Sequence, residues 1–175
     1  MRDVLIVVDM QKDFIDGALG TAEAVAIVPK VVEKVLGFKG DILFTRDTHF
    51  EDYMDTQEGS NLPVPHCIRG TEGRQICREL QPFAENAPIM DKVTFGAMEL
   101  GPVLQDMHAD GAISSITFVG LCTDICVISN VMIAKAFLPE VPVIVDAACC
   151  AGVTPESHRT ALASMRTCQV KIVND

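Results

Sequence analysis

The chain has 175 residues, of which 49% are hydrophobic and only 5% aromatic, and its formal net charge is -10. This length suits one compact domain, residues 1–175, with a core of substantial size. The negative charge argues against nucleic acid or an anionic membrane as a partner, because both require a basic surface. Electrostatics instead favour a neutral or weakly charged small molecule as substrate.

The cysteines and the first apolar run indicate the compartment. The seven cysteines are an odd number at irregular spacings, and Cys149 and Cys150 are adjacent, so they fit no disulfide framework. The apolar run at residues 4–8 is too short, and too soon interrupted by Asp9, for a signal peptide or a membrane span. We therefore expect reduced thiols in a cytoplasmic protein.

Apolar runs bounded by turn residues alternate with stretches of helical period along the chain. This alternation is typical of parallel strands joined by crossover helices. Strands are expected at residues 4–8, 42–45, 89–91, 116–121, 143–145 and 170–173. Helices are expected at residues 22–36, 75–80, 100–108, 124–136 and 155–165. The sequence therefore predicts a three-layer α/β/α fold around a six-stranded, mainly parallel, Rossmann-like sheet.

Polar residues follow four of the predicted strands. They are, in chain order, Asp9, Asp47, Lys92 and Cys126. The ligand crevice of a parallel sheet lies beyond the carboxyl ends of its strands, so these side chains are expected to converge. A carboxylate beside a thiol can take its proton and later pass it to a leaving amine, while a lysine keeps the carboxylate ionised. Taken singly, Asp9 is better explained as a turn residue or a solvated strand end, and Lys92 as an ordinary surface lysine. Their combined placement after separate strands favours catalysis.

Cys126 is the candidate nucleophile, because it lies where the strand at residues 116–121 turns into a helix. Thr123 or Asp124 is expected to cap that helix. A thiol in the first turn of a helix lies near the positive end of the macrodipole and near free backbone N–H groups, which favour the thiolate and can hold an oxyanion. The alternative is that Cys126 is one of several small buried hydrophobic residues.

Several segments match, in order, the motifs of a known superfamily. DMQKDF at residues 9–14 and GLCTDICV at residues 120–127 resemble the opening and nucleophile motifs of the isochorismatase-like cysteine hydrolases. DKVTFGA at residues 91–97 is similar to the segment with the family's lysine, and VDA at residues 145–147 with TPESH at residues 154–158 resembles its C-terminal signature. The resemblance spans the chain.

This resemblance implies the roles of several residues. Asp9, Lys92 and Cys126 would form the catalytic triad of an amidase-type enzyme. The family also has a cis peptide bond, here Leu121–Cys122, which would aim the Cys122 N–H into the site, so that it and the Cys126 N–H hold the oxyanion.

The polar interval at residues 46–74 is too long for an idle connection in a compact domain. TRDTH at residues 45–49 and PVPHCIRGTEG at residues 63–73 resemble the nicotinamidase branch of the superfamily. Asp47 and His49 lie two residues apart, so in an extended loop both side chains emerge on one side and can share a cation.

The nicotinamidase resemblance implies a metal site and a ring pocket. Its metal ligands would be Asp47, His49 and His66, with Glu58 where some relatives place a fourth. Mixed nitrogen and oxygen ligands suit Zn2+, with Fe2+ or Mn2+ as alternatives, and no organic cofactor is expected.

The ring pocket departs from the family pattern in one respect. Phe14 resembles the aromatic residue that lines this pocket, although plain core packing explains it nearly as well. The chain has no tryptophan, whereas many nicotinamidases stack one on the pyridine. Tyr53 or Leu62 is expected to take its place.

Three functions follow as hypotheses. The first is the hydrolysis of nicotinamide to nicotinate and ammonia through a thioester on Cys126. The second is another cysteine hydrolase with the same triad, which acts on a carbamoyl or ureido compound and needs no metal. The third is a redox-sensing protein in which Cys126 pairs with Cys122, although their spacing is not Cys-x-x-Cys. Relatives commonly assemble as dimers or larger rings, so a homo-oligomer of unspecified size is expected.

Overall fold

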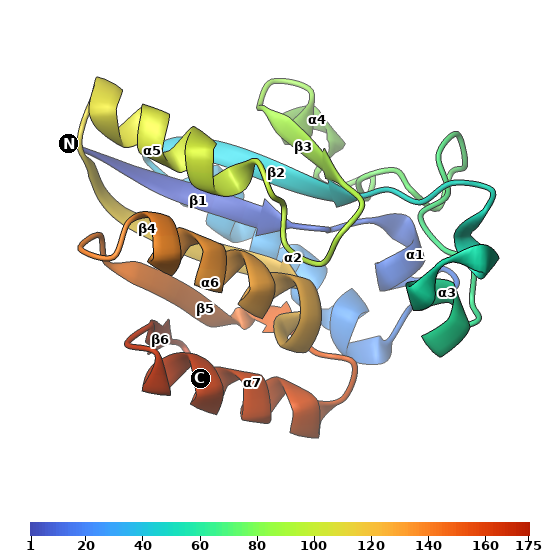
Figure 1. The fold of residues 1–175 in the computed structure, drawn as a ribbon. Coiled ribbons are helices and arrows are strands. Elements are labelled where there is room, and N and C mark those ends of the chain that lie inside the picture. Colours follow the sequence, from blue (N-terminus) through green and yellow to red (C-terminus); the bar gives the residue numbers. More distant parts are fainter.

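A six-stranded sheet forms the centre of the computed structural model, which describes residues 1–175 (Figure 1). The strand order is β3-β2-β1-β4-β5-β6, and every neighbouring pair is parallel. The strands are β1 (Arg2–Val8), β2 (Asp41–Asp47), β3 (Ile89–Lys92), β4 (Ile113–Leu121), β5 (Val143–Ala151) and β6 (Lys171–Val173). The predicted α/β class and all six strands are confirmed.

Helices cover both faces of the sheet, as Figure 1 shows. One face carries α2 (Ala22–Gly37) with the short helices α1 (Lys12–Ile15) and α4 (Gln81–Ala84). The other carries α5 (Leu100–Asp110), α6 (Ile128–Phe137) and α7 (Pro155–Thr167). The remaining helical segments are α3 (Gln57–Asn61), a 3-10 turn at Tyr53–Asp55 and a π-helical turn at Thr123–Val127. No helix has both the length and the apolar character needed to cross a membrane.

The central strand β1 is buried on both sides because its side chains alternate between two hydrophobic cores. Val4, Ile6 and Val8 point into the core beneath α5, α6 and α7, while Leu5 and Val7 point into the core beneath α2. All five are fully buried, and burial of each contributes about 1.5–3 kcal/mol relative to exposure. An uninterrupted apolar run is therefore what this strand requires.

The crevice of the sheet lies between β1 and β4, because the connections leave these neighbouring strands in opposite directions. The chain passes from β1 to β2 through α2 on one face, and from β4 to β5 through α6 on the other. The segments that follow β1 and β4 therefore diverge and leave space at the carboxyl ends of these strands. Asp9 begins the first segment and Cys122 begins the second.

The prediction of a helix at residues 75–80 is wrong. Ile76 instead forms an antiparallel bridge with Gln11. The Lys12 N–H donates to the Gln75 carbonyl, and the Cys77 N–H donates to the Met10 carbonyl. These contacts use the backbone groups that a helix would need, so α4 begins only at Gln81. Residues 75–77 therefore hold residues 10–12, which follow β1, in place.

Other boundaries differ from the predicted ones in ways that matter for the site. Strand β5 continues to Ala151, beyond the predicted end at residue 145, and its register with β4 shifts between Phe118 and Gly120. The helix predicted at residues 124–136 begins as the π-helical turn before α6. The Thr154 cap of α7 is confirmed, since the Ser157 N–H donates to its hydroxyl at 3.0 Å.

Gly120 is the glycine at which the sheet leaves no room for a side chain. Its φ is +118°, and a Cβ there would lie 2.1 Å from the Val8 carbonyl oxygen. We expect Gly120→Ala to lower the free energy of unfolding by at least about 2 kcal/mol, because strain and a backbone clash combine. Urea denaturation measures the change. Gly37→Ala is the control, since a Cβ at Gly37 meets nothing within 4 Å; equal stability of both variants would contradict this packing.

Candidate active site

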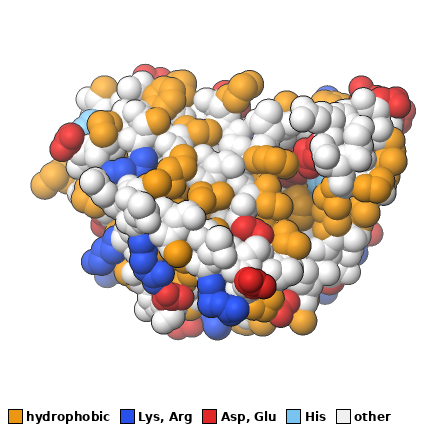
Figure 2. All heavy atoms as spheres, turned by 60° about the horizontal axis from the view of Figure 1, so that its bottom comes forward, with side chains coloured by type: hydrophobic (Ala, Val, Ile, Leu, Met, Phe, Trp, Pro, Cys, Tyr) orange, Lys and Arg blue, Asp and Glu red, His pale blue; other side chains and the backbone are white.

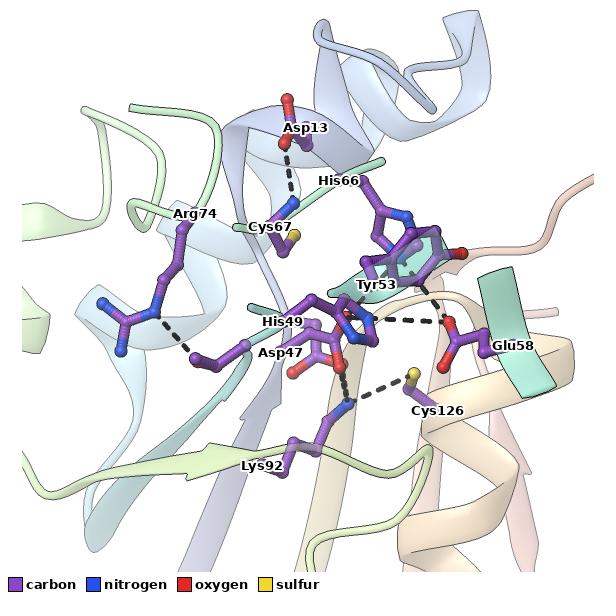
Figure 3. A network of polar contacts seen from close by, with 12 residues as sticks. Asp13, Asp47, His49, Tyr53, Glu58, His66, Cys67, Arg74, Lys92 and Cys126 are labelled. Atoms are coloured by element: carbon purple, nitrogen blue, oxygen red, sulfur yellow. Dashed lines mark hydrogen bonds and ion pairs between the residues drawn. The ribbon is translucent and has the colours of Figure 1, made fainter. Parts of the chain in front are cut away.

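Three residues from separate strand ends meet around one ammonium group, and Figure 3 labels two of them, Asp47 and Cys126, beside Lys92. The Lys92 Nζ lies 2.7 Å from Asp9 Oδ2, 3.0 Å from Asp47 Oδ1 and 3.4 Å from Cys126 Sγ. The strand ends bring them together, because Asp9 follows β1, Asp47 and Lys92 end β2 and β3, and Cys126 lies in the turn after β4. The convergence expected from sequence is therefore present.

The ion pair between Lys92 and Asp9 is buried, and burial sets the protonation of both groups. Asp9 is fully buried, which raises the pKa of its carboxyl despite the opposing charge of Lys92. Burial alone would lower the pKa of Lys92, but the negative charges of Asp9 and Asp47 outweigh it and raise that pKa above its ordinary value. Lys92 thus stays an ammonium, while Asp9 is a better proton acceptor than an exposed aspartate.

The sequence predicted that Cys126 lies where the thiolate is favoured, but the structure indicates the opposite. Burial, followed by the charge of Asp9, raises the pKa of this thiol well above its ordinary value, although Lys92 acts in the opposite direction. Proximity to a helix N-terminus therefore does not make a resting thiolate here. The sulfur needs a base to remove its proton. Asp9 shares the Lys92 ammonium with it, and its raised pKa suits it to accept that proton.

Side chains in the turn that carries Cys126 contact other segments and do not cap the turn. The peptide bond Leu121–Cys122 is cis, as the family resemblance implied. Neither Thr123 nor Asp124 caps the turn, contrary to expectation. The Thr123 hydroxyl instead lies 2.7 Å from His158 Nδ1 on α7, and the Asp124 carboxylate accepts the Val153 N–H at 3.1 Å. The first contact ties the turn to α7, and the second ties it to the segment between β5 and α7.

Asp47, His49 and His66 form a buried cluster beside the ammonium. One ligand atom from each lies within 4.8 Å of the others. The His66 Nδ1 lies 2.8 Å from the Val64 carbonyl, which leaves the Nε2 side of the ring to face Asp47 Oδ2 at 3.7 Å. The predicted ligands therefore converge, although His66 follows Asp47 by nineteen positions in sequence.

One atom of this cluster indicates that a cation fits it. The buried His49 Nε2 lies 2.8 Å from Asp47 Oδ2 and faces Glu58 Oε1 at 3.6 Å. A metal ion shared by this nitrogen and the carboxylates would satisfy both, because imidazole and carboxylate groups are the ligands that Zn2+ binds in proteins. The predicted fourth residue, Glu58 on α3, lies farther away, with Oε1 3.6 Å from His49 Nε2 and 3.7 Å from His66 Nε2.

A pocket of about 840 Å³ opens onto the thiol and the histidine cluster. It is lined by both polar and apolar side chains, among them Cys126, Asp47, His49 and Phe95. Figure 2 shows hydrophobic side chains gathered around a hollow on this part of the surface. The volume falls within the range of small-molecule sites, and apolar walls with a few convergent polar groups are typical of them.

The structure places the three predicted ring-pocket residues differently. Phe14 and Leu62 line the pocket, and the Phe14 ring centroid lies 5.4 Å from that of His66. Tyr53 does not line it, so of the two residues expected in the place of a tryptophan only Leu62 does. Its buried ring packs edge-on against His49 and His66, and its hydroxyl donates to the Leu62 carbonyl at 2.8 Å. Tyr53 thus supports the histidines from behind.

Three polar residues near the site were given no role by sequence analysis. The Thr45 hydroxyl donates to Asp9 Oδ1 at 2.7 Å. The side chain of Gln11 contacts the backbone of Asp47, and that of Asn130 contacts the backbone of Cys126. Gln11 lies in the motif at residues 9–14, so its place was visible in the sequence, but its contacts depend on the fold.

Comparison with known proteins identifies the family. The model of the isochorismatase domain matches residues 3–174. The chain belongs to the isochorismatase family. A nicotinamidase/pyrazinamidase of Mycobacterium tuberculosis is 28% identical to this family member over 182 aligned positions, which cover 97% of each chain.

Solved structures agree with this family assignment. The pyrazinamidase of Pyrococcus horikoshii, solved in complex with zinc, is 29% identical, with a TM-score of 0.84 over 100% of both chains. A nicotinamidase of Bacillus subtilis is 26% identical, with a TM-score of 0.81 over 98% of both chains. The isochorismatase-family fold therefore extends over the whole chain.

Removing the central ammonium should destabilise the protein strongly. We expect Lys92→Met to lower the free energy of unfolding by about 3–5 kcal/mol, because two buried carboxylates lose their partner. The double variant Asp9→Asn/Lys92→Met should recover part of this loss, since one of the two carboxylates is then neutral. Urea denaturation at pH 8 tests both changes, and a double variant less stable than Lys92→Met would contradict the buried pairing.

The partial burial of His158 should make stability depend on pH. Burial lowers the pKa of His158, an effect only partly opposed by the charges of Asp175 and Asp124. As pH falls below the ordinary value of 6.5, the unfolded chain therefore binds this proton more readily than the folded chain, and folding stability decreases.

Urea denaturation at pH 7.5 and pH 5.5 measures this effect. The wild-type protein should lose more stability between the two pH values than His158→Gln, which has no proton to bind there. Equal losses in both proteins would show that His158 does not carry this dependence.

Proposed function

We propose that this chain is a metal-dependent cysteine amidohydrolase that converts nicotinamide to nicotinate and ammonia. The observation that carries the proposal is the buried Lys92 ammonium, which contacts Asp9, Cys126 and a carboxylate of the histidine cluster. One group thus joins a nucleophile, a base and a candidate metal site beside a single pocket. The relatives named nicotinamidase or pyrazinamidase, which match nearly the full chain, support the choice of substrate.

In the acylation step, Asp9 takes the proton of the Cys126 thiol as the sulfur attacks the carboxamide carbon. A C–S bond forms, and the carbonyl becomes an oxyanion held by the backbone N–H groups of Cys122 and Cys126. When the C–N bond breaks, Asp9 passes its proton to the leaving nitrogen, which departs as ammonia. The raised pKa of Asp9 suits both transfers, because the carboxyl must accept and then release one proton.

In the deacylation step, Asp9 acts again on a water molecule. It takes a proton as the water oxygen attacks the thioester carbon, and the same N–H groups hold the second oxyanion. The C–S bond then breaks, and the proton on Asp9 passes to the sulfur. Nicotinic acid leaves and releases its own proton to solvent to become nicotinate. Lys92 remains charged throughout, since its pKa lies above its ordinary value, and it stabilises the thiolate that forms transiently.

Asp47, His49 and His66 would hold a divalent metal ion, with Glu58 close to the same position. We assign Zn2+ first, because two nitrogen donors and one carboxylate suit it and the Pyrococcus horikoshii relative was solved with zinc. When bound, the ion supplies a positive charge that holds the ring nitrogen of the substrate, directly or through water. Phe14 and Leu62 would contact the ring from the pocket wall.

The two alternative functions have less support. A hydrolase of carbamoyl or ureido compounds would use the same triad without a metal, and would leave the buried cluster of Asp47, His49 and His66 without a role. A redox sensor needs accessible thiols of low pKa. Burial raises the pKa of Cys122 to about 12 and that of Cys126 well above its ordinary value, which disfavours that role.

The cellular setting is also part of this proposal. We place the enzyme in the cytoplasm, since all seven cysteines are free. Residues 1–175 would form one domain. Its partner would be a small carboxamide rather than nucleic acid or membrane. Assembly as a homo-oligomer stays a prediction from the family resemblance.

Ammonia release from nicotinamide by the purified protein tests the proposal. We expect Cys126→Ala and Asp9→Asn each to lower kcat by at least about 1000-fold, because the first lacks the nucleophile and the second lacks the base. Removal of metal with a chelator should also abolish turnover, and Zn2+ should restore it. Cys168→Ala is the matched control, because that thiol is exposed, and it should retain full activity.

Each outcome separates one of the alternatives. Turnover of a ureido compound but not of nicotinamide, unaffected by chelation, would favour the metal-free hydrolase. Nicotinamide turnover that survives Cys126→Ala would refute the cysteine mechanism.

A further inference from the structure

Gln11 is a fully buried amide whose side chain makes three hydrogen bonds, all to backbone groups. Its Oε1 accepts the Asp47 N–H at 2.7 Å, and its Nε2 donates to the Asp47 carbonyl at 2.8 Å. The same Nε2 donates to the Arg74 carbonyl at 2.9 Å. Both backbone groups of Asp47 are therefore bound by one side chain.

The side chain of Gln11 continues the sheet where β1 has ended. The ladder between β1 and β2 finishes at Val8 and Thr45, and the Asp9 N–H still donates to the Thr45 carbonyl. Two residues farther along β2, the groups of Asp47 that face β1 have no strand beside them. The amide of Gln11 offers them one acceptor and one donor, as a backbone residue would.

Asp47 needs this support because its two carboxylate oxygens face two different groups. Oδ1 lies 3.0 Å from Lys92 Nζ, and Oδ2 lies 2.8 Å from His49 Nε2. A small rotation of the Asp47 backbone would therefore displace the carboxylate from both the ammonium and the histidine cluster. Removing a hydrogen-bonding group that orients a metal ligand commonly lowers the affinity for the metal 10- to 100-fold.

We propose that Gln11 is the positioning residue of Asp47 and thereby sets the affinity of the histidine cluster for its metal ion. The inference rests on the proposed function, since it assumes that Asp47, His49 and His66 bind a divalent cation. Gln11 itself contacts neither the cation nor the substrate. It acts through the backbone of the ligand that bridges the cluster and Lys92.

Asn130 offers a matched control, because it is a second fully buried amide that serves the other half of the site. Its Nδ2 donates to the Cys126 carbonyl at 2.8 Å and to the Phe95 carbonyl at 3.4 Å, and its Oδ1 accepts the Ala97 N–H at 2.9 Å. It therefore joins the nucleophile turn to the segment after β3 and makes no contact with Asp47. Removing it should impair the nucleophile without changing the metal site.

The experiment measures the Kd for Zn2+ by competition with a chromophoric chelator, with kcat for nicotinamide and thermal unfolding in parallel. Gln11→Met preserves length and removes all three hydrogen bonds, and we expect it to weaken Zn2+ binding about 10- to 100-fold. Gln11→Glu should weaken binding as well, because its carboxylate still accepts the Asp47 N–H but faces two carbonyl oxygens. Asn130→Leu should leave the Kd for Zn2+ within twofold of wild type while lowering kcat.

The possible results separate this inference from the proposed function. Wild-type protein that binds no Zn2+ would refute the assigned metal site. Wild-type binding that is unchanged in a folded Gln11→Met or Gln11→Glu variant would refute only the role of Gln11. Failure of both variants to fold, or an equal loss of Zn2+ affinity in Asn130→Leu, would also overturn it, because the amide would then support the fold in general.

Discussion

The buried Lys92 ammonium is the constraint on which the rest of the site depends. Two carboxylates, those of Asp9 and Asp47, lie in the same buried region, where water cannot solvate them and their charges repel each other. Lys92 contacts both, at 2.7 and 3.0 Å, and also lies 3.4 Å from the Cys126 sulfur. The nucleophile and the candidate metal site are thus coupled through a single positive charge.

The fold supplies this meeting point because its strands are parallel and the β1–β4 boundary opens a crevice at their carboxyl ends. Strong apolar burial on both faces holds β1 rigidly, so residues that follow it have a defined position. Buried side chains then fix the segments that follow the strands. Gln11 and Asn130 bind the backbone of these segments, and Tyr53 packs against His49.

The strands and the convergence of Asp9, Lys92 and Cys126 were predictable from sequence, because buried parallel strands are continuous apolar runs and their last residues share one edge. The helix expected at residues 75–80 was wrong because its backbone pairs with residues 10–12, far away in sequence. The thiolate expected at Cys126 was wrong because burial outweighs proximity to a helix N-terminus. Tyr53 was misplaced because only the fold shows that its ring lies behind the histidines.

The acyl-enzyme offers the most direct test of the central claim that Lys92 unites nucleophile and base around one amide. Acid quenching during nicotinamide turnover, followed by peptide mass spectrometry, reports which residue carries the acyl group. The account predicts a nicotinoyl thioester on Cys126 in the wild-type protein and none in Lys92→Met. An acyl group on another residue, or undiminished acylation of Cys126 without Lys92, would contradict it.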